Sequence, residues 1–157
     1  MVKTETLHPN NLRISAAGLA LIKAFERFRG VEYLCPAGKP TIGYGHVILY
    51  GEAFAQPFTE AQASALLLED CALAEIYINA NVRVRLAQHE FDALVSFVFN
   101  IGVGAFDRST MRRFLNLGDR AATANEFTRW DKVGKVPMLG LTRRRAAERA
   151  MFEGRAA

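Results

Sequence analysis

The clearest pattern of hydrophobic and polar positions along the chain lies in residues 88–100. Large apolar side chains recur there at helical spacing, at Phe91, Leu94, Val95, Val98 and Phe99. Side chains three and four residues apart share one face of an α-helix, so this stripe predicts a helix that packs against several neighbours. We therefore expect a helix from Gln88 to Asn100 at the centre of the hydrophobic core.

Five more segments combine apolar residues at helical spacing with residues that start and end helices. Ser15 is the expected N-cap of the first helix and Gly30 its stop, which places Glu26 in the last turn. Thr59 opens a capping box, and Thr142 is the expected cap of the last helix. The predicted helices cover residues 15–29, 59–79, 109–116, 119–130 and 142–153.

The stretch between the first two helices has a different pattern. Residues 31–50 are rich in glycine and proline, which break helices, and in aromatic and β-branched residues, which favour strands. This predicts a small β-hairpin or a three-stranded sheet. The expected fold class is α+β and mainly helical, with a polar arm at 1–13 and a single domain at 14–157, in which the hairpin lobe covers about 31–58.

The composition indicates a globular protein with an anionic partner. Half of the 157 residues are apolar, enough for one sizeable core, and the net charge is +4. Basic residues gather in the last third of the chain, which favours nucleic acid, a membrane surface or a cell-wall polymer as partner. No stretch resembles a membrane span, and residues 1–13 lack the apolar part of a signal peptide, so we expect synthesis in the cytoplasm.

Neither a disulfide framework nor a metal site is indicated. Cys35 and Cys71 are the only two cysteines, and the three histidines show no metal-ligand spacing. We therefore predict no metal and no cofactor. The sequence leaves open whether Cys35 and Cys71 can pair.

Residues 25–47 hold the side chains best suited to chemistry. Glu26 is expected at a helix C-terminus beside two phenylalanines, and both the helix dipole and an apolar setting favour the protonated carboxyl that a general acid needs. Cys35 lies in a Cys-Pro-Ala-Gly turn, where an ordinary thiol is mostly neutral. Thr41 and His46 bound the segment Thr-Ile-Gly-Tyr-Gly-His. Each residue also has a plain structural interpretation, as a solvated glutamate, a buried cysteine, a strand threonine and a structural histidine.

The spacing of these residues resembles that of a known family. Glu26, Cys35 and Thr41 match the pattern Glu-x8-(Asp or Cys)-x5-Thr of the phage-type lysozymes of glycoside hydrolase family 24. Supporting segments follow in order along the chain: Ile-Ser-x-x-Gly-Leu, Thr-Ile-Gly-Tyr-Gly-His, Phe-Asn-Ile-Gly, Trp130, Gly140-Leu141, and Arg144-Arg145 with Glu148. The resemblance spans about residues 14–152.

The resemblance implies a lysozyme-like fold, with the hairpin lobe and a helical lobe on either side of an active-site cleft. It also implies an endolysin that hydrolyses the β-1,4 bond between N-acetylmuramic acid and N-acetylglucosamine in peptidoglycan, with inversion. Glu26 is then the general acid, Thr41 helps to hold the attacking water, and Cys35 stands where many members have Asp. A neutral thiol can do less than a carboxylate to activate water or to stabilise positive charge on the sugar.

Substrate-binding positions follow from the same resemblance. Val47, Phe99 and Asn100 match residues that line the cleft, and the amide of Asn100 suits the N-acetyl group of a sugar. Phe99 has core packing as its alternative, because it continues the apolar stripe.

Supporting residues are implied as well. His46 is expected to pair with Asp70 and so to tie the hairpin to the long helix. Arg144, with Arg145 as the second candidate, is expected to reach the catalytic acid. Arginines in the first turn of the last helix would oppose its dipole, which makes their position unusual.

Two other functions remain open at this point. A cysteine peptidase would use Cys35 as nucleophile and His46 as base, although a turn containing Pro36 is not a helix N-terminus that would activate a thiol. A non-catalytic module that binds the wall or nucleic acid through its basic residues is the other alternative. We expect instead a monomeric muramidase whose partner is peptidoglycan, with no nucleic acid and no membrane insertion. It would act from the host cytoplasm on the cell wall, once a separately encoded holin-type pore releases it.

Overall fold

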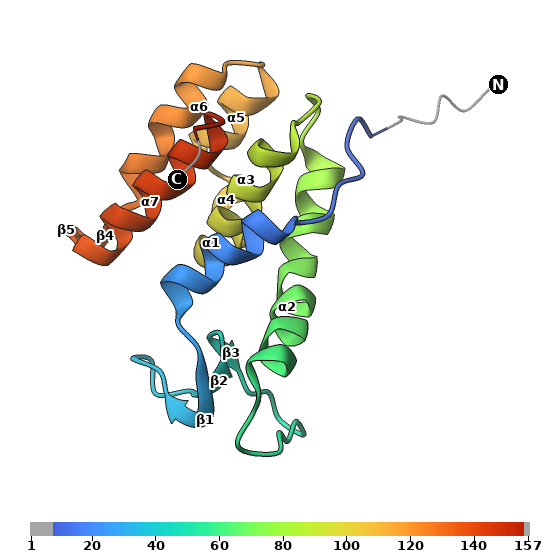
Figure 1. The fold of residues 1–157 in the computed structure, drawn as a ribbon. Coiled ribbons are helices and arrows are strands. Elements are labelled where there is room, and N and C mark those ends of the chain that lie inside the picture. The colour runs from blue at the N-terminus through green and yellow to red at the C-terminus, as the bar shows by residue number, and fades with distance from the viewer. Residues whose placement is uncertain (1–7, 156–157) are drawn as a thin grey trace.

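A computed structural model describes residues 8–155 and shows a helical body with a small sheet at one end (Figure 1). The elements within these residues are α1 (Ala16–Glu26), β1 (Arg29–Leu34), β2 (Pro40–Gly43), β3 (His46–Val47), α2 (Glu60–Asn81), α3 (Gln88–Ile101), α4 (Val103–Asp107), α5 (Thr110–Asn116), α6 (Arg120–Glu126), the 3-10 helix η1 (Phe127–Trp130), β4 (Lys132–Val133), β5 (Val136–Pro137) and α7 (Leu139–Phe152). The predicted α+β class, mainly helical with a small sheet inserted early, is confirmed.

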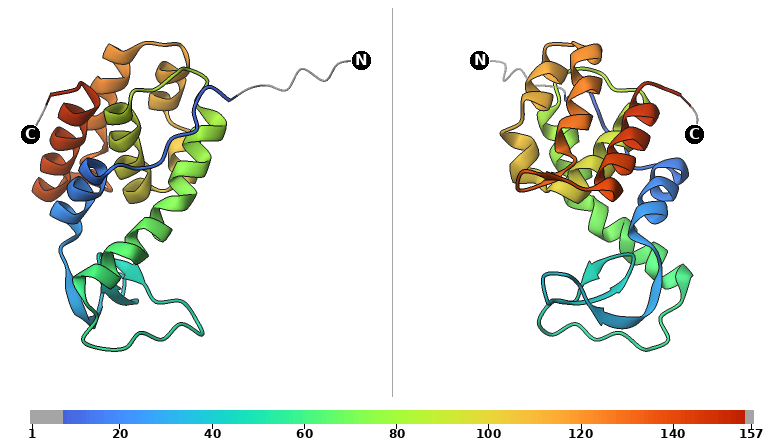
Figure 2. Two further views of the ribbon diagram at one scale, coloured as in Figure 1. Left: turned by 45° about the vertical axis from the view of Figure 1, so that its right-hand side comes forward. Right: turned by 90° about the vertical axis from the view of Figure 1, so that its left-hand side faces the viewer.

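The sheet of β1, β2 and β3 lies apart from most of the helices. Its strands are antiparallel in the order β1-β2-β3, so that Thr41 on the central strand faces Tyr33 on one side and Val47 on the other. β1 continues from the end of α1, and the long α2 returns from the sheet to the helical body (Figure 2). The end of α1 is therefore where the sheet joins the helices.

Helix α3 is the centre of the core, as its hydrophobic stripe predicts. Residues 90–98 are all buried, and the helix contacts α1, α2 and α7. Phe97 stands edge-on to three other rings, with centroid distances of 6.4, 5.2 and 5.7 Å to Phe106, Phe127 and Trp130. Phe99 is only partly buried, so it lies at the edge of this core.

The first helix ends earlier than predicted, and Gly30 has another role. α1 ends at Glu26, because the next residue, Arg27, has a φ of 57°. Gly30 lies inside β1, where its carbonyl accepts a hydrogen bond from Phe58 N at 2.7 Å. A Cβ at Gly30 would come within 2.8 Å of Phe58 O, so the glycine permits a close backbone approach and does not stop a helix.

The last helix begins before Thr142, which is not its cap. α7 starts at Leu139, and the Thr142 hydroxyl lies 3.2 Å both from Met138 O and from Asp131 Oδ2. The predicted loop before the helix contains the β4–β5 hairpin, which returns the chain so that Met138 N donates to Asp131 O at 2.8 Å. The arginines at 143–145 therefore lie in the second turn, where the helix dipole opposes them less than expected.

Other boundaries differ by smaller amounts. Residues 103–107 form α4, which two neighbouring glycines concealed in the sequence, and residues 119–130 divide into α6 and η1. The long helix continues to Asn81. Residues 1–7 of the predicted arm lie outside the described residues. Asn10 is buried, and its Nδ2 donates to Val82 O and Val84 O at 3.2 and 2.8 Å.

Candidate active site

Glu26 lies where the sheet joins the helical body. The Nη1 group of Arg144, from α7, donates to Glu26 Oε1 at 2.6 Å. The Arg144 side chain is 5% exposed and that of Glu26 is 22% exposed, so the pair is sheltered while the carboxyl remains open to solvent. A charge-assisted hydrogen bond to a buried guanidinium fixes the position of the carboxyl. The contact that the sequence suggested for Arg144 is present in the structure.

The turn between β2 and β3 approaches the same carboxyl. Gly45 has a φ of 80°, and a Cβ there would lie 3.0 Å from Glu26 Oε2. Both the backbone conformation and the approach of Glu26 therefore require glycine at this position. The sequence marks Gly45 only as a helix breaker and does not show this contact.

We expect Gly45→Ala to lower lytic activity about 100-fold, because a displacement of about 1 Å at a reacting group costs that much. The backbone strain alone should lower the free energy of unfolding by about 1–2 kcal/mol. Gly51→Ala is the matched control, because Gly51 has a φ of 88° and nothing lies within 4 Å of its added Cβ. Rates of wall lysis and chemical unfolding curves would separate the two effects. Equal activity of the two variants would show that the Gly45 contact does not position Glu26.

Cys35 and Thr41 lie close together at the β1–β2 turn, where both bond the Lys39 carbonyl. Cys35 begins a tight turn after β1, in which Cys35 N donates to Lys39 O at 3.0 Å. Thr41 is 1% exposed, and its Oγ1 donates to the same carbonyl at 2.9 Å. A hydrogen bond from the Lys39 backbone is the largest cause that lowers the pKa of the Cys35 thiol; Ala37 N–H and the Thr41 hydroxyl act in the same direction, and burial opposes them. Cys35 is therefore more acidic than the ordinary thiol that the sequence suggests.

Tyr33 lies on β1, between Glu26 and Cys35 in the chain. Burial raises the pKa of the Tyr33 phenol, and the negative charges of Glu26 and Cys35 raise it further, against the effect of Arg29. In the fold, Tyr33 lies opposite Thr41 on β2, Cys35 follows Tyr33 after one residue, and Glu26 ends α1 shortly before β1 begins. The structure thus gathers the three residues of the Glu-x8-Cys-x5-Thr pattern around β1 and β2.

His46 lies between two carboxylates and away from the thiol. Its Nδ1 is 2.9 Å from Asp70 Oδ1, on α2, and its Nε2 is 3.0 Å from Glu52 Oε2. Both ring nitrogens are thus engaged, and within residues 8–155 neither forms a hydrogen bond with Cys35. A cysteine peptidase needs a base in contact with its nucleophile. The observed arrangement favours the structural tie between sheet and helix over a catalytic Cys35–His46 pair.

The His46 cluster should make stability depend on pH. Burial lowers the pKa of His46, but hydrogen bonds and charges from Glu52 and Asp70 together outweigh burial and raise the pKa above its ordinary value of 6.5. The folded protein then holds the proton more tightly than the unfolded chain, so the stabilisation is present below about pH 6.5 and is lost as the pH rises through the folded-state pKa. We expect His46→Gln to lower the melting temperature more at pH 5.5 than at pH 8.5. Equal losses at both pH values would contradict this.

Arg145 does not reach Glu26. Its Nη2 donates to Asn100 Oδ1, and its Nε donates to Trp130 O at 3.0 Å. Because the Asn100 oxygen is engaged, the amide NH2 group remains to donate to a ligand. A buried carboxylate, Glu148, lies between Arg144 and Arg145 and contacts both. In the sequence, Glu148 only supports the family resemblance and has no assigned role, although a glutamate three and four residues after two arginines predicts ion pairs on a helix.

Val47 and Phe99 are the remaining predicted site residues. Val47 lies directly opposite Thr41 in the β2–β3 ladder and is half-buried. Phe99 is half-buried beside Asn100 at the end of α3. Both keep exposed surface next to the groups described above, and their contact with a ligand stays a prediction.

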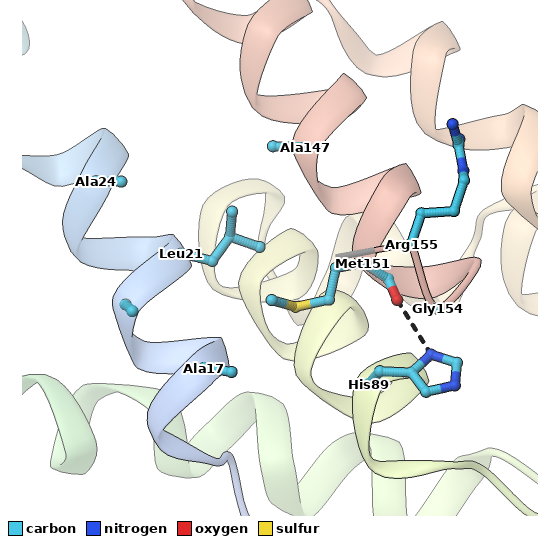
Figure 3. Close-up of a pocket in the computed structure, with 9 residues that line it drawn as sticks. Ala17, Leu21, Ala24, His89, Ala147, Met151, Gly154 and Arg155 are labelled. Carbon is cyan, nitrogen blue, oxygen red and sulfur yellow. Dashed lines mark hydrogen bonds between the residues drawn. The ribbon is translucent and has the colours of Figure 1, made fainter. Parts of the chain in front are cut away.

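A separate apolar groove of about 580 Å³ lies between α1 and α7 (Figure 3). Leu21 and Met151 extend into it from the two helices, and Ala17, Ala24 and Ala147 also line it (Figure 3). His89 closes one end, where its Nδ1 lies 3.0 Å from Met151 O. None of the residues between 8 and 155 that line the groove is a carboxylate, so they offer no acid for glycoside chemistry.

Residues 8–155 offer neither a cluster of metal ligands nor a membrane-spanning helix. This part of the chain contains no group of three or more His, Cys, Asp or Glu side chains that could hold a metal ion. None of its helices is both long enough and apolar enough to cross a membrane. Cys35 and Cys71 are both free thiols.

Comparisons with known proteins agree with this geometry. A family model described as phage lysozyme matches residues 23–148. The endolysin of Acyrthosiphon pisum secondary endosymbiont phage 1 is 42% identical over 146 residues, which cover 90% of this chain and 99% of that endolysin. A crystal structure of a lysozyme variant from Salmonella phage P22 matches with a TM-score of 0.82 and 40% identity, over 91% of this chain and 99% of that one. The muramidase domain of SpmX from Asticaccaulis excentricus matches with a TM-score of 0.82 and 36% identity, over 90% and 98%.

Proposed function

Because the chain belongs to the phage lysozyme family and is a lysozyme, we propose that it is an endolysin with Glu26 as its general acid. The bond cleaved is the β-1,4 link from N-acetylmuramic acid to N-acetylglucosamine in peptidoglycan. One observation carries the assignment of the acid: the partly exposed Glu26 carboxyl is bound by a buried arginine, Arg144, at a place where Gly45 leaves room for it. Such fixed placement is what general acid catalysis requires.

In the proposed reaction, Glu26 donates its proton to O4 of N-acetylglucosamine as the bond from C1 of N-acetylmuramic acid breaks. Water then attacks C1 from the opposite face of the sugar, with inversion. Since Thr41 Oγ1 donates to Lys39 O, its lone pairs are free to accept a hydrogen bond from that water. Cys35 lies beside Thr41 with a lowered pKa and, in its thiolate form, takes the proton that the water loses and becomes a neutral thiol.

Chemical modification should distinguish the two thiols. Cys71 is fully buried, and burial, with the nearby charges of Glu75 and Asp70, raises its pKa to about 12, whereas Cys35 is partly exposed and more acidic than usual. The thiolate is the reactive form, so we expect iodoacetamide to label Cys35 alone in the native protein and to block wall lysis. Peptide mass mapping and turbidity assays measure both. Cys35→Asp should stay active and resist the reagent; an alkylated wild-type enzyme with full activity would place Cys35 outside the site.

Product analysis tests the proposed reaction. Digestion of purified peptidoglycan should release reducing sugar ends and no new free amines. Release of amines without reducing ends would indicate a peptidase or amidase, and release of neither would indicate a binding module. Either of those results would overturn the proposal.

The biological setting is proposed on the same basis. We propose that the enzyme is a monomer that accumulates in the host cytoplasm and causes lysis after a holin-type pore releases it to the wall. The basic last third of the chain would favour an anionic wall polymer. Analytical ultracentrifugation of the purified protein tests the monomer, and co-expression with and without a holin tests the route.

A further inference from the structure

The most deeply buried carboxylate next to the site is that of Glu148, which is 0% exposed. Its Oε1 accepts hydrogen bonds from Ser96 Oγ at 2.7 Å and from Arg144 Nε at 3.1 Å. Its Oε2 accepts from Arg145 Nη1. Glu148 therefore holds two buried arginines at once, through both of its oxygens.

Each of the two guanidinium groups also binds a second residue, and both of these residues have a proposed role in catalysis or substrate binding. Arg144 Nη1 bonds the proposed acid, Glu26, at 2.6 Å. Arg145 Nη2 bonds the amide oxygen of Asn100. A continuous series of contacts thus runs from Glu26 through Arg144, Glu148 and Arg145 to Asn100, with charges that alternate in sign until the neutral amide.

The negative charge of Glu148 compensates the positive charges of two buried arginines. Arg144 and Arg145 are adjacent in the chain, and their side chains are only 5% and 1% exposed. Burial lowers the pKa of Arg145, the charge of Arg144 lowers it further, and the carboxylate of Glu148 opposes both. Without that carboxylate the two guanidinium groups would repel each other in a medium that screens charges poorly. Each would then shift from its contact with Glu26 or Asn100.

Packing and backbone contacts limit where the arginines can go. The Arg145 guanidinium lies over the Phe97 ring, 4.9 Å from its centroid, and that of Arg144 lies 5.8 Å from the Phe25 ring centroid. Arg144 Nη2 also donates to Ser96 O at 3.3 Å. Among the residues that the structure describes, Glu148 is the one that pairs by charge with both guanidinium groups.

We propose that Glu148 is a positioning residue for the reaction, which through Arg144 sets the place and charge environment of the Glu26 carboxyl and through Arg145 fixes the amide of Asn100. The inference rests on the proposed roles of Glu26 and Asn100. Glu148 contacts neither of them directly and acts only through the two arginines.

The proposal predicts a particular kinetic change in Glu148→Gln. The neutral amide leaves the Arg144 charge less compensated, so the ionised form of Glu26 is favoured and the alkaline limb of the pH–kcat/KM profile should move down by about one pH unit. At neutral pH kcat should fall about tenfold. KM for soluble, uncrosslinked peptidoglycan chains should rise several-fold, because Asn100 is no longer fixed.

Two further variants separate positioning from folding. Glu148→Asp keeps the charge and should return the alkaline limb to its wild-type position, while its shorter reach to the arginines should lower kcat and raise KM. Glu153→Gln is the matched control, since Glu153 is on the next turn beyond Glu148, pairs with Arg149 and Arg155, and is 28% exposed. Its kinetics and profile should equal those of the wild type. Circular dichroism and melting curves of all variants report the fold.

The results that would refute the positioning role of Glu148 differ from those that would refute the proposed muramidase reaction. If wild type releases reducing ends and Glu148→Gln has the pH profile and KM of Glu153→Gln, only the positioning role fails. If Glu148→Gln does not fold, Glu148→Asp decides: wild-type kcat and KM for Asp, despite its shorter reach to the arginines, would also refute the role. Loss of all reducing-end release in the wild type would refute the proposed reaction itself.

Discussion

The Glu26→Gln variant is expected to release reducing ends from peptidoglycan about 100- to 10,000-fold more slowly than the wild type, the range that loss of a general acid produces. The amide has nearly the shape of the carboxyl but no proton acidic enough to transfer to the leaving oxygen. Initial rates of reducing-end release at fixed pH measure the effect. Binding of soluble peptidoglycan chains should change much less than turnover.

The structure indicates that this variant will still fold. The Gln side-chain oxygen can accept the hydrogen bond that Arg144 Nη1 now gives to Glu26, and Arg144 keeps its pair with buried Glu148. Glu32→Gln is a matched control, because Glu32 is an exposed carboxylate on β1 in the same lobe. A melting temperature near that of wild type with lost turnover supports the acid role. Retained lysis by Glu26→Gln would exclude the proposed mechanism.

Replacing Phe97 with Ala should be the most destabilising of the substitutions considered. Phe97 is fully buried and contacts Phe106, Phe127 and Trp130, and its ring supports the Arg145 guanidinium. Removing a buried phenylalanine side chain costs about 3–5 kcal/mol through lost burial and the cavity left behind. That is a large share of the roughly 5–15 kcal/mol by which a domain of this kind is stable. Urea unfolding of the variant measures the loss.

Phe99→Ala gives the matching comparison on the same helix. Phe99 is half-buried, so its truncation should cost less stability than that of Phe97. If Phe99 lines the substrate site, its variant should lose more activity than stability, whereas Phe97→Ala should lose activity only as it unfolds. Equal losses of stability would show that Phe99 is simply a core residue.

The parts of the fold that the sequence could predict are those that one segment determines by itself. The apolar stripe of α3 can be buried in only one orientation, so this helix packs as expected. The capping box at Thr59 supplies hydrogen-bond partners for the first N–H groups of α2, so that helix starts where expected. The spacing of Glu26, Cys35 and Thr41 likewise survives into the structure, because the short β1–β2 connection keeps them together.

The parts that the sequence could not predict depend on distant partners. The sequence suggests that Gly30 stops a helix, but its actual role depends on the close approach of Phe58. Thr142 likewise suggests an N-cap, but the β4–β5 hairpin places the start of the helix earlier. The same applies to the site. Arg144 and Glu26 are far apart in the chain, and only the packing of α7 against α1 and α3 brings them together. The burial of Glu148 between the two arginines has the same origin.

We propose that Glu26 protonates the leaving oxygen of a bond whose cleavage makes N-acetylmuramic acid the new reducing end. The most direct test digests purified peptidoglycan with wild type and with Glu26→Gln, reduces the products with borohydride and identifies the sugar alcohol by mass spectrometry. We predict muramitol derivatives from wild type and almost none from Glu26→Gln. Glucosaminitol derivatives from wild type, or equal muramitol from both proteins, would contradict the account.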